Sequence, residues 1–88
     1  MHAAVFNVKI NDRSAAEVGL REQVVPAAKA APGFAAGYWL DRGNDRGMAV
    51  VVFDSQENAQ AWVDGQAPTD DAPITREGAE VVAVVADA

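Results

Sequence analysis

Hydrophobic and polar residues alternate along two stretches of the chain, as they do in half-buried β-strands. Residues 5–10 place Phe6, Val8 and Ile10 on one face and Val5, Asn7 and Lys9 on the other. Residues 34–41 alternate in the same way, with Phe34, Ala36, Tyr38 and Leu40 on one face and Ala35, Gly37, Trp39 and Asp41 on the other. These two stretches predict the first and second strands.

Two further segments have the composition of strands. Residues 48–53 are apolar on both faces and rich in β-branched side chains, which is typical of a strand in the middle of a sheet. Between them and the preceding strand, residues 42–47 contain mostly turn-forming residues and predict a hairpin. A last apolar run predicts a fourth strand at about residues 80–85.

Helical periodicity occupies the interval after the first strand. Ser14 and Glu17 have the spacing of a capping box, so we expect the helix to begin there. Pro26 lacks the N–H that would bond to the Glu22 carbonyl, which predicts a kink, and Pro32-Gly33 ends the helix. The apolar stripe of this helix comprises Leu20, Val24, Ala27, Ala28 and Ala31.

A second helix is predicted after the third strand. Residues 54–57 offer a plausible cap, and the pattern ends near Gly65. Ala59, Trp62 and Val63 fall on the face that would point inward. A polar loop with Pro68, Asp70, Asp71 and Pro73 then leads to the fourth strand.

The resulting order, β-α-β-β-α-β over residues 1–88, predicts one ferredoxin-like α+β domain, with a four-stranded antiparallel sheet and both helices on one face. Residues 5–10 and 48–53 are apolar on at least part of both faces, but two helices can cover only one. A second copy of the sheet is the simplest cover for the other face, which predicts a homodimer. A lid formed by residues 66–78 is the alternative, although its acidic and proline content suits an apolar face poorly.

Composition limits the function classes. A net charge of -6 and a pI of about 4.4 argue against nucleic-acid binding. No apolar run approaches the roughly 20 residues that span a bilayer, and the N-terminus lacks the pattern of a secretory signal, so we expect a cytoplasmic protein. The chain has no Cys, which excludes disulfides, thiol catalysis and thiolate metal sites. Ala and Val dominate the apolar residues, so the core is thin and self-association is favoured.

Five short segments have a recognisable sequence: Val25-Pro26, Ala31-Pro32-Gly33-Phe34, Gly37-Tyr38-Trp39, Val51-Val52-Phe53-Asp54-Ser55 and Asn58-Ala59-Gln60-Ala61-Trp62. With these segments the chain resembles the dimeric α/β-barrel superfamily, close to the antibiotic-biosynthesis-monooxygenase type. The resemblance implies two facing sheets that form a barrel, and a ligand cavity between sheet and helices. Known activities of the superfamily include cofactor-independent oxygenation of aromatic polyketides, haem degradation and isomerisation.

The same resemblance implies two catalytic residues. Asn7 and Trp62 occupy the positions of an Asn on the first strand and a Trp on the second helix that some oxygenating and haem-degrading members use. The carboxamide could hold a substrate oxygen or dioxygen by hydrogen bonding, and the indole could form a rigid wall. Haem-degrading members also need a His shortly after that Trp, but residues 66–74 contain none and His2 lies at the N-terminus. We therefore expect no cofactor and consider haem unfavoured.

Other side chains are candidates for ligand contact. Phe34, Tyr38, Trp39 and Phe53 could line the pocket, although the sequence does not assign which of Tyr38 and Trp39 faces it. Lys9 and Arg76 could neutralise an acidic ligand, but a solvated surface explains them more simply. We predict no metal site, because the spacing of the acidic residues Asp41, Asp45, Asp70 and Asp71 matches no Ca²⁺ loop.

Two functional hypotheses follow. In the first, the protein resembles cofactor-independent monooxygenases of aromatic or polyketide-like substrates, in which the substrate carbanion reduces dioxygen while Asn7 orients it and Trp62 forms the wall. In the second, it is a non-catalytic dimeric module for ligand binding or protein interaction. No strong general base is evident, so the sequence leaves open whether the protein is an enzyme.

Overall fold

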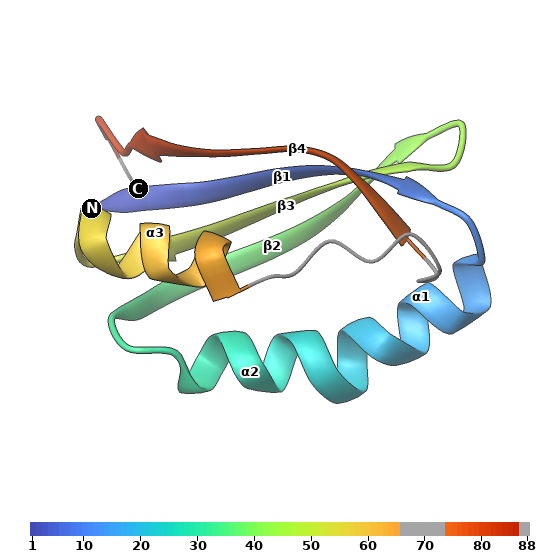
Figure 1. Cartoon of the computed structure of the whole chain (residues 1–88), viewed down its shortest axis with the longest axis horizontal. Helices are drawn as coiled ribbons and strands as arrows, with labels where there is room; N and C mark the ends of the chain where they lie inside the picture. The colour runs from blue at the N-terminus through green and yellow to red at the C-terminus, as the bar shows by residue number, and fades with distance from the viewer. Residues whose placement is uncertain (66–73, 87–88) are drawn as a thin grey trace.

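The protein is described by a computed structural model that covers residues 1–65 and 74–86. Four strands form an antiparallel sheet in the order β2-β3-β1-β4, and the helices lie together on one side of it (Figure 1). The predicted ferredoxin-like α+β fold is confirmed, with β1 and β3 in the centre. The elements are β1 (His2–Ile10), α1 (Arg13–Gly19), η1 (Leu20–Val24), α2 (Val25–Ala30), β2 (Phe34–Gly43), β3 (Arg46–Phe53), α3 (Gln56–Gly65) and β4 (Ile74–Ala83).

The two faces of the sheet differ in what covers them. The helix face packs against α2 and α3, and its buried sheet residues are Ala4, Phe6, Val51 and Phe53. The far face carries the alternate residues of the same strands, and none of the helices in the described part of the chain lies over it (Figure 1). The remaining members of the buried core are Ala28 of α2 and Ala59 and Trp62 of α3.

Strand β4 is longer than the sequence pattern predicts. It begins at Ile74 rather than at about Glu80, and it pairs with β1 from Ile10 opposite Ile74 to His2 opposite Ala83. β4 lies at the edge of the sheet, where its first half can carry polar side chains. The apolar run therefore marks only the second half of the strand. The loop predicted before it, with its Pro and Asp residues, lies in 66–73, outside the described residues.

The capping box predicted at Ser14 is wrong. Asp12 is the N-cap of α1, and its Oδ1 accepts a hydrogen bond of 3.1 Å from the Ala15 N–H. Ser14 already lies inside the helix, so its hydroxyl does not occupy the capping position. The cap predicted for α3 is present, because Ser55 Oγ accepts from the Asn58 N–H at 3.2 Å.

The helix between β1 and β2 continues through Pro26. The π-helical turn η1 directly precedes it, and the Val25 N–H bonds back to the carbonyl of Leu20, five residues earlier. This wider turn comes where the missing N–H of proline interrupts the regular α-helical bonding. The expected interruption therefore takes the form of η1, and the helix resumes as α2.

A bulge in β2 changes which aromatic residues share a face. The pairing with β3 shifts between Phe34 and Ala36, so Phe34 lies opposite Phe53 while Trp39 lies opposite Ala49. Phe34 and Trp39 are therefore both on the helix face. The strict alternation that grouped Phe34 with Tyr38 is wrong at this point, because it allowed no extra residue in the strand.

The hairpin between β2 and β3 is tighter than the predicted loop of residues 42–47. Its turn consists of Asn44 and Asp45, whose φ angles are 54° and 58°. Two successive residues with positive φ are what the favoured two-residue hairpin requires, and Asn and Asp tolerate this conformation well. The turn therefore joins the two strands directly.

Candidate ligand site on the helix face

Aromatic side chains from three elements meet on the helix face. The Phe34 and Phe53 rings lie 6.4 Å apart in an edge-to-face arrangement, and the Phe53 and Trp62 rings lie 6.1 Å apart with a tilt of 41°. Phe53 is fully buried and Trp62 nearly so. Three of the predicted pocket or catalytic residues are thus brought together, and they form the packed end of the helix face.

Trp39 also lies on the helix face, and Tyr38 does not. A Cβ added at Gly37 would come within 2.8 Å of the Trp39 ring, so this glycine leaves the space that the indole occupies. Tyr38 pairs with Val50 on the far face and is 59% exposed. The orientation that the sequence left open is therefore settled: Trp39 faces the helices.

The helix-face side chains of β3 become smaller toward α1. Phe53 and Val51 lie under α2 and α3 and are fully buried, whereas Ala49 and Gly47 follow toward the hairpin. Ala49 is paired with Trp39 on one side and with Phe6 on the other. The helix face therefore has small residues at Ala49 and Gly47 beside the buried ring of Phe6 and the half-buried ring of Trp39, and this strip is called the trough over Ala49 below.

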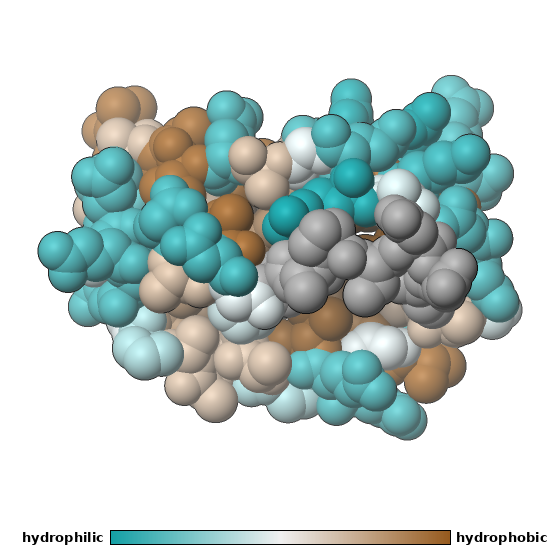
Figure 2. Space-filling model, in the orientation of Figure 1, coloured by the Kyte–Doolittle hydropathy of each residue, from teal (hydrophilic) through white to brown (hydrophobic). Residues whose placement is uncertain are grey.

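Helix α1 does not fill this region. Neither α1 nor η1 contributes a buried residue, and Val18 is 54% exposed although it is apolar. A hollow of about 630 Å³ lies along α1 and is called the α1 hollow below; its size is within the range of small-molecule sites. Figure 2 shows apolar surface between the polar side chains on this side of the molecule. The residues lining the α1 hollow are Asp12, Ser14, Ala15, Val18, Gly19 and Gln23.

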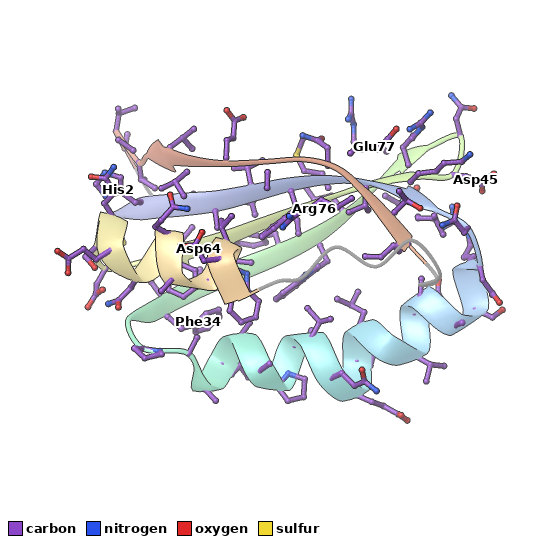
Figure 3. All side chains as sticks on the ribbon, in the orientation of Figure 1. His2, Phe34, Asp45, Asp64, Arg76 and Glu77 are labelled. Atoms are coloured by element: carbon purple, nitrogen blue, oxygen red, sulfur yellow. The ribbon has the colours of Figure 1, made fainter. Side chains whose placement is uncertain are left out.

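A cation reaches the helix face from β4. Arg76 lies opposite Val8, and its guanidinium carbon is 5.9 Å from the centroid of the Phe6 ring, in the range of a cation–π contact. Figure 3 shows Arg76 directed toward the helices and Glu77 directed away from them. Sequence reasoning named Arg76 only as one of two possible partners for an acid, because it could not tell which face the residue occupies.

Asn7 lies on the far face. It is paired with Met48 of β3 and Gly78 of β4, and its Oδ1 accepts a hydrogen bond of 3.0 Å from Arg42 Nη1. The sheet therefore separates Asn7 from Trp62, and the structure does not bring the two predicted catalytic residues together within one chain. The alternation of Phe6 and Val8 with Asn7 already contained this signal, since the apolar side of the strand packs against the helices.

The far face also carries a charged cluster near the hairpin. Arg46 forms an ion pair with Glu77 beside a hollow of about 290 Å³ that Arg42 and Asn44 also line. The hydrogen bond from Arg46 lowers the pKa of Glu77, and the charges of Arg46, Lys9 and Arg42 act in the same direction. All these groups are solvent-exposed, so the cluster is a surface network.

Residues 1–65 and 74–86 show neither a cluster of metal ligands nor a membrane-spanning helix. This part of the chain contains no group of three or more His, Cys, Asp or Glu side chains placed to hold a metal ion. Within the same ranges, no helix has both the length and the apolar character that crossing a membrane requires. His2 is paired with Phe53 at the opposite end of the sheet from the α1 hollow, and its Nδ1 is buried without a hydrogen-bond partner.

Comparison with known proteins places the fold. No family model and no characterised protein sequence matches the chain. Among the solved structures that match, three cover the full length of this chain and 98–99% of their own. The chain has the fold of haem-degrading proteins. These neighbours belong to the monooxygenase-like superfamily of ferredoxin-like folds that the sequence resembles.

The three structures differ in what they bind. A mutant of MhuD with two manganese protoporphyrin IX molecules per active site has a TM-score of 0.62 and 23% identity. MhuD from Mycobacterium tuberculosis with two haems in its active site has a TM-score of 0.59 and 20% identity. The haem-degrading protein Rv3592 of Mycobacterium tuberculosis, in a haem-free form with cleaved protein, has a TM-score of 0.59 and 26% identity.

These structures correct the expectation about cofactors. We expected none and considered haem unfavoured because no His follows Trp62, and that expectation is wrong: proteins of this fold hold haem or manganese protoporphyrin in their active sites. The neighbours are themselves haem-degrading proteins, whereas the sequence led us to expect an aromatic or polyketide-like substrate.

Proposed function

We propose that this chain binds a porphyrin between α1 and the helix face of the sheet, in the manner of a monooxygenase-like, haem-degrading protein. The observation that carries the proposal is that neither α1 nor η1 contributes a buried residue, so the helix leaves apolar side chains uncovered at the α1 hollow, whose described lining comes from α1, its N-cap and η1. The trough over Ala49 adds two aromatic walls, Phe6 and Trp39. Its structural neighbours hold porphyrins in their active sites, which supports this choice of ligand.

The shape and chemistry of the space suit the ring of a porphyrin. A porphyrin is flat and aromatic, with two apolar faces and carboxylates at one edge. Offset or edge-on contact with Trp39 and Phe6 would stabilise such a ring, and α1 would cover its other face. In this proposal Trp62 acts indirectly, by packing against Phe53 at the closed end of the site.

The metal of a metalloporphyrin fits less well than the ring. Among the described residues that border the α1 hollow and the trough, there is no His, Cys, Met or Tyr. Tyr38 and Met48 point to the far face, and His2 lies at the opposite end of the sheet. These residues therefore offer walls and charge but no usual axial ligand, and we derive no chemical step through a metal.

Porphyrin titration tests the proposal directly. The purified protein would be titrated with haemin and with metal-free protoporphyrin IX, following ligand absorbance and Trp fluorescence. We expect saturable binding, and we expect Ala49→Phe to weaken it at least tenfold because the added ring fills the trough. Ala35→Phe adds the same ring at an exposed position of β2 and should leave affinity unchanged. A lack of saturable binding by either porphyrin would contradict the proposal.

A turnover assay distinguishes a haem-degrading enzyme from a protein that only binds the porphyrin. The haem complex would be incubated in air with a reductant, and haem absorbance would be followed beside product analysis by mass spectrometry. Conversion of haem to an open-chain tetrapyrrole would identify a haem-degrading enzyme. A complex that stays intact would favour the second hypothesis, a ligand-binding module that has kept the fold.

We also propose that two copies associate through their far faces. Tyr38, Leu40 and Val82 lie on this face and are 59%, 48% and 39% exposed, although each is large and hydrophobic. Burial of such a surface against a second copy would compensate for the thin core of one chain. Light scattering at micromolar concentration should give twice the 9.2 kDa chain mass, and Leu40→Lys should reduce it. A single 9.2 kDa species for the unaltered chain would refute the dimer.

A further inference from the structure

The bulge in β4 determines which charge faces the proposed ligand. Asn7 pairs with Gly78, but the next residue of β1, Val8, pairs with Arg76, so Glu77 is the extra residue of the bulge. In an unbulged strand Val8 would pair with Glu77, and the carboxylate would lie on the helix face. The bulge instead places Arg76 there and directs Glu77 to the far face, where Arg46 binds it (Figure 3).

On the basis of the proposed porphyrin site, we propose that Arg76 binds a carboxylate of the ligand and makes the site selective for acidic planar molecules. Its guanidinium lies against the Phe6 ring, one of the two aromatic walls of the trough. A ligand ring seated over Ala49 would therefore bring an edge carboxylate toward this cation. Arg carries five N–H donors in a planar fork that suits a carboxylate, in addition to any other group it contacts.

The surroundings of Arg76 strengthen such a bond. The residue is half-buried, in contrast to the exposed Lys9 on the same strand pair. Charge-assisted hydrogen bonds in partly desolvated sites contribute more than those on an open surface. The protein as a whole carries a net charge of -6, so its overall field repels anionic ligands and local attraction has to come from a placed cation.

A pair of arginines on opposite faces provides the test. Arg76→Gln removes the cation on the helix face, and Arg46→Gln removes one from the far face with the same change of charge. Each variant would be titrated with protoporphyrin IX and with its dimethyl ester, which has the same ring without ionised carboxylates. We expect Arg76→Gln to weaken binding of the diacid about tenfold or more, as loss of a charge-assisted hydrogen bond implies, and binding of the ester less than threefold.

One further variant and the ligand pair keep the outcomes distinct. Arg76→Lys should restore part of the preference for the diacid, and circular dichroism would confirm that each variant is folded. Equal weakening for diacid and ester, or an equal effect of Arg46→Gln, would overturn the role of Arg76 while leaving the proposed function intact. If the unaltered protein binds neither compound, the proposed function fails and this inference fails with it.

Discussion

Strand β3 belongs to two different environments at once. Its helix-face residues Phe53 and Val51 are fully buried, whereas the alternate residues Val50 and Val52 are half-buried on the far face, between the central strand β1 and the edge strand β2. Both sets are apolar, so the composition of the strand does not distinguish them. What differs is the cover, because α2 and α3 pack on only one side. An apolar strand therefore predicts that both of its faces are buried. Which face is buried within a single chain depends on the helices that pack beside the sheet.

The largest difference in stability between the two faces is expected when one aromatic ring is removed from each face. Phe53→Ala leaves a cavity among Phe34, Trp62 and the sheet, and should lower the free energy of unfolding by about 3–5 kcal/mol. Tyr38→Ala removes an exposed ring and should cost less than about 1 kcal/mol of the stability of the single chain. Urea unfolding followed by circular dichroism measures both. Similar losses for the two variants would show that the far face is as well packed as the helix face.

A smaller difference in stability is expected between alanine substitutions at two glycines, Gly33, which connects α2 to β2, and Gly43 at the end of β2. Gly33 has a φ of 77°, and a Cβ there would overlap the Asp54 and Asn58 side chains, so Gly33→Ala should destabilise the protein by about 2–4 kcal/mol. Gly43 has a φ of 80° but no atom within 4 Å of an added Cβ, so Gly43→Ala should cost only about 1 kcal/mol. Thermal unfolding of the two variants gives the comparison. An equal effect would mean that backbone conformation alone, and not contact with Asp54 and Asn58, sets the cost at Gly33.

The smallest effect is expected from the ion pair on the far face. Because Arg46 lowers the pKa of Glu77, the charged carboxylate stabilises the folded protein above its unfolded pKa, and this contribution is lost as pH falls through the folded pKa. Glu77→Gln should therefore be slightly less stable than the unaltered protein at pH 7, and the difference should disappear in acid. Both side chains are exposed, so added salt should also reduce it. Denaturant unfolding from pH 7 to pH 3 measures the difference, and a constant gap would contradict its electrostatic origin.

Much of the fold could be predicted because alternation, helical periodicity and turn residues agree along the chain. One error occurs where β2 contains an extra residue, between Phe34 and Ala36, since a period of two allows no such shift. The start of β4 was missed for another reason: an edge strand exposes polar side chains that look like a loop. Asp12 rather than Ser14 caps α1, because both residue types suit a cap and only the backbone decides between them.

The candidate site was less accessible to sequence reasoning than the fold. The resemblance identified Asn7 and Trp62 as a pair, but the sheet lies between them, and any catalytic role for either remains a prediction. Trp39 could not be separated from Tyr38 because both faces of β2 are partly apolar. The position of Arg76 depends on a bulge that leaves no clear mark in the local sequence. These features come from strand register, which is set by pairing with distant segments.

The π-helical turn also affects how the lining of the α1 hollow could change. A π-turn holds one more residue than an α-helical turn, and each helical residue rotates the chain by about 100° around the axis. Deletion of one residue within Leu20–Val24 would restore the α-helical bonding and turn the faces of α1 relative to α2. A different set of α1 side chains would then face the sheet, while Ala28 could keep its place in the core. At this helix, a change of length by one residue would therefore alter the lining of the α1 hollow along the whole of α1.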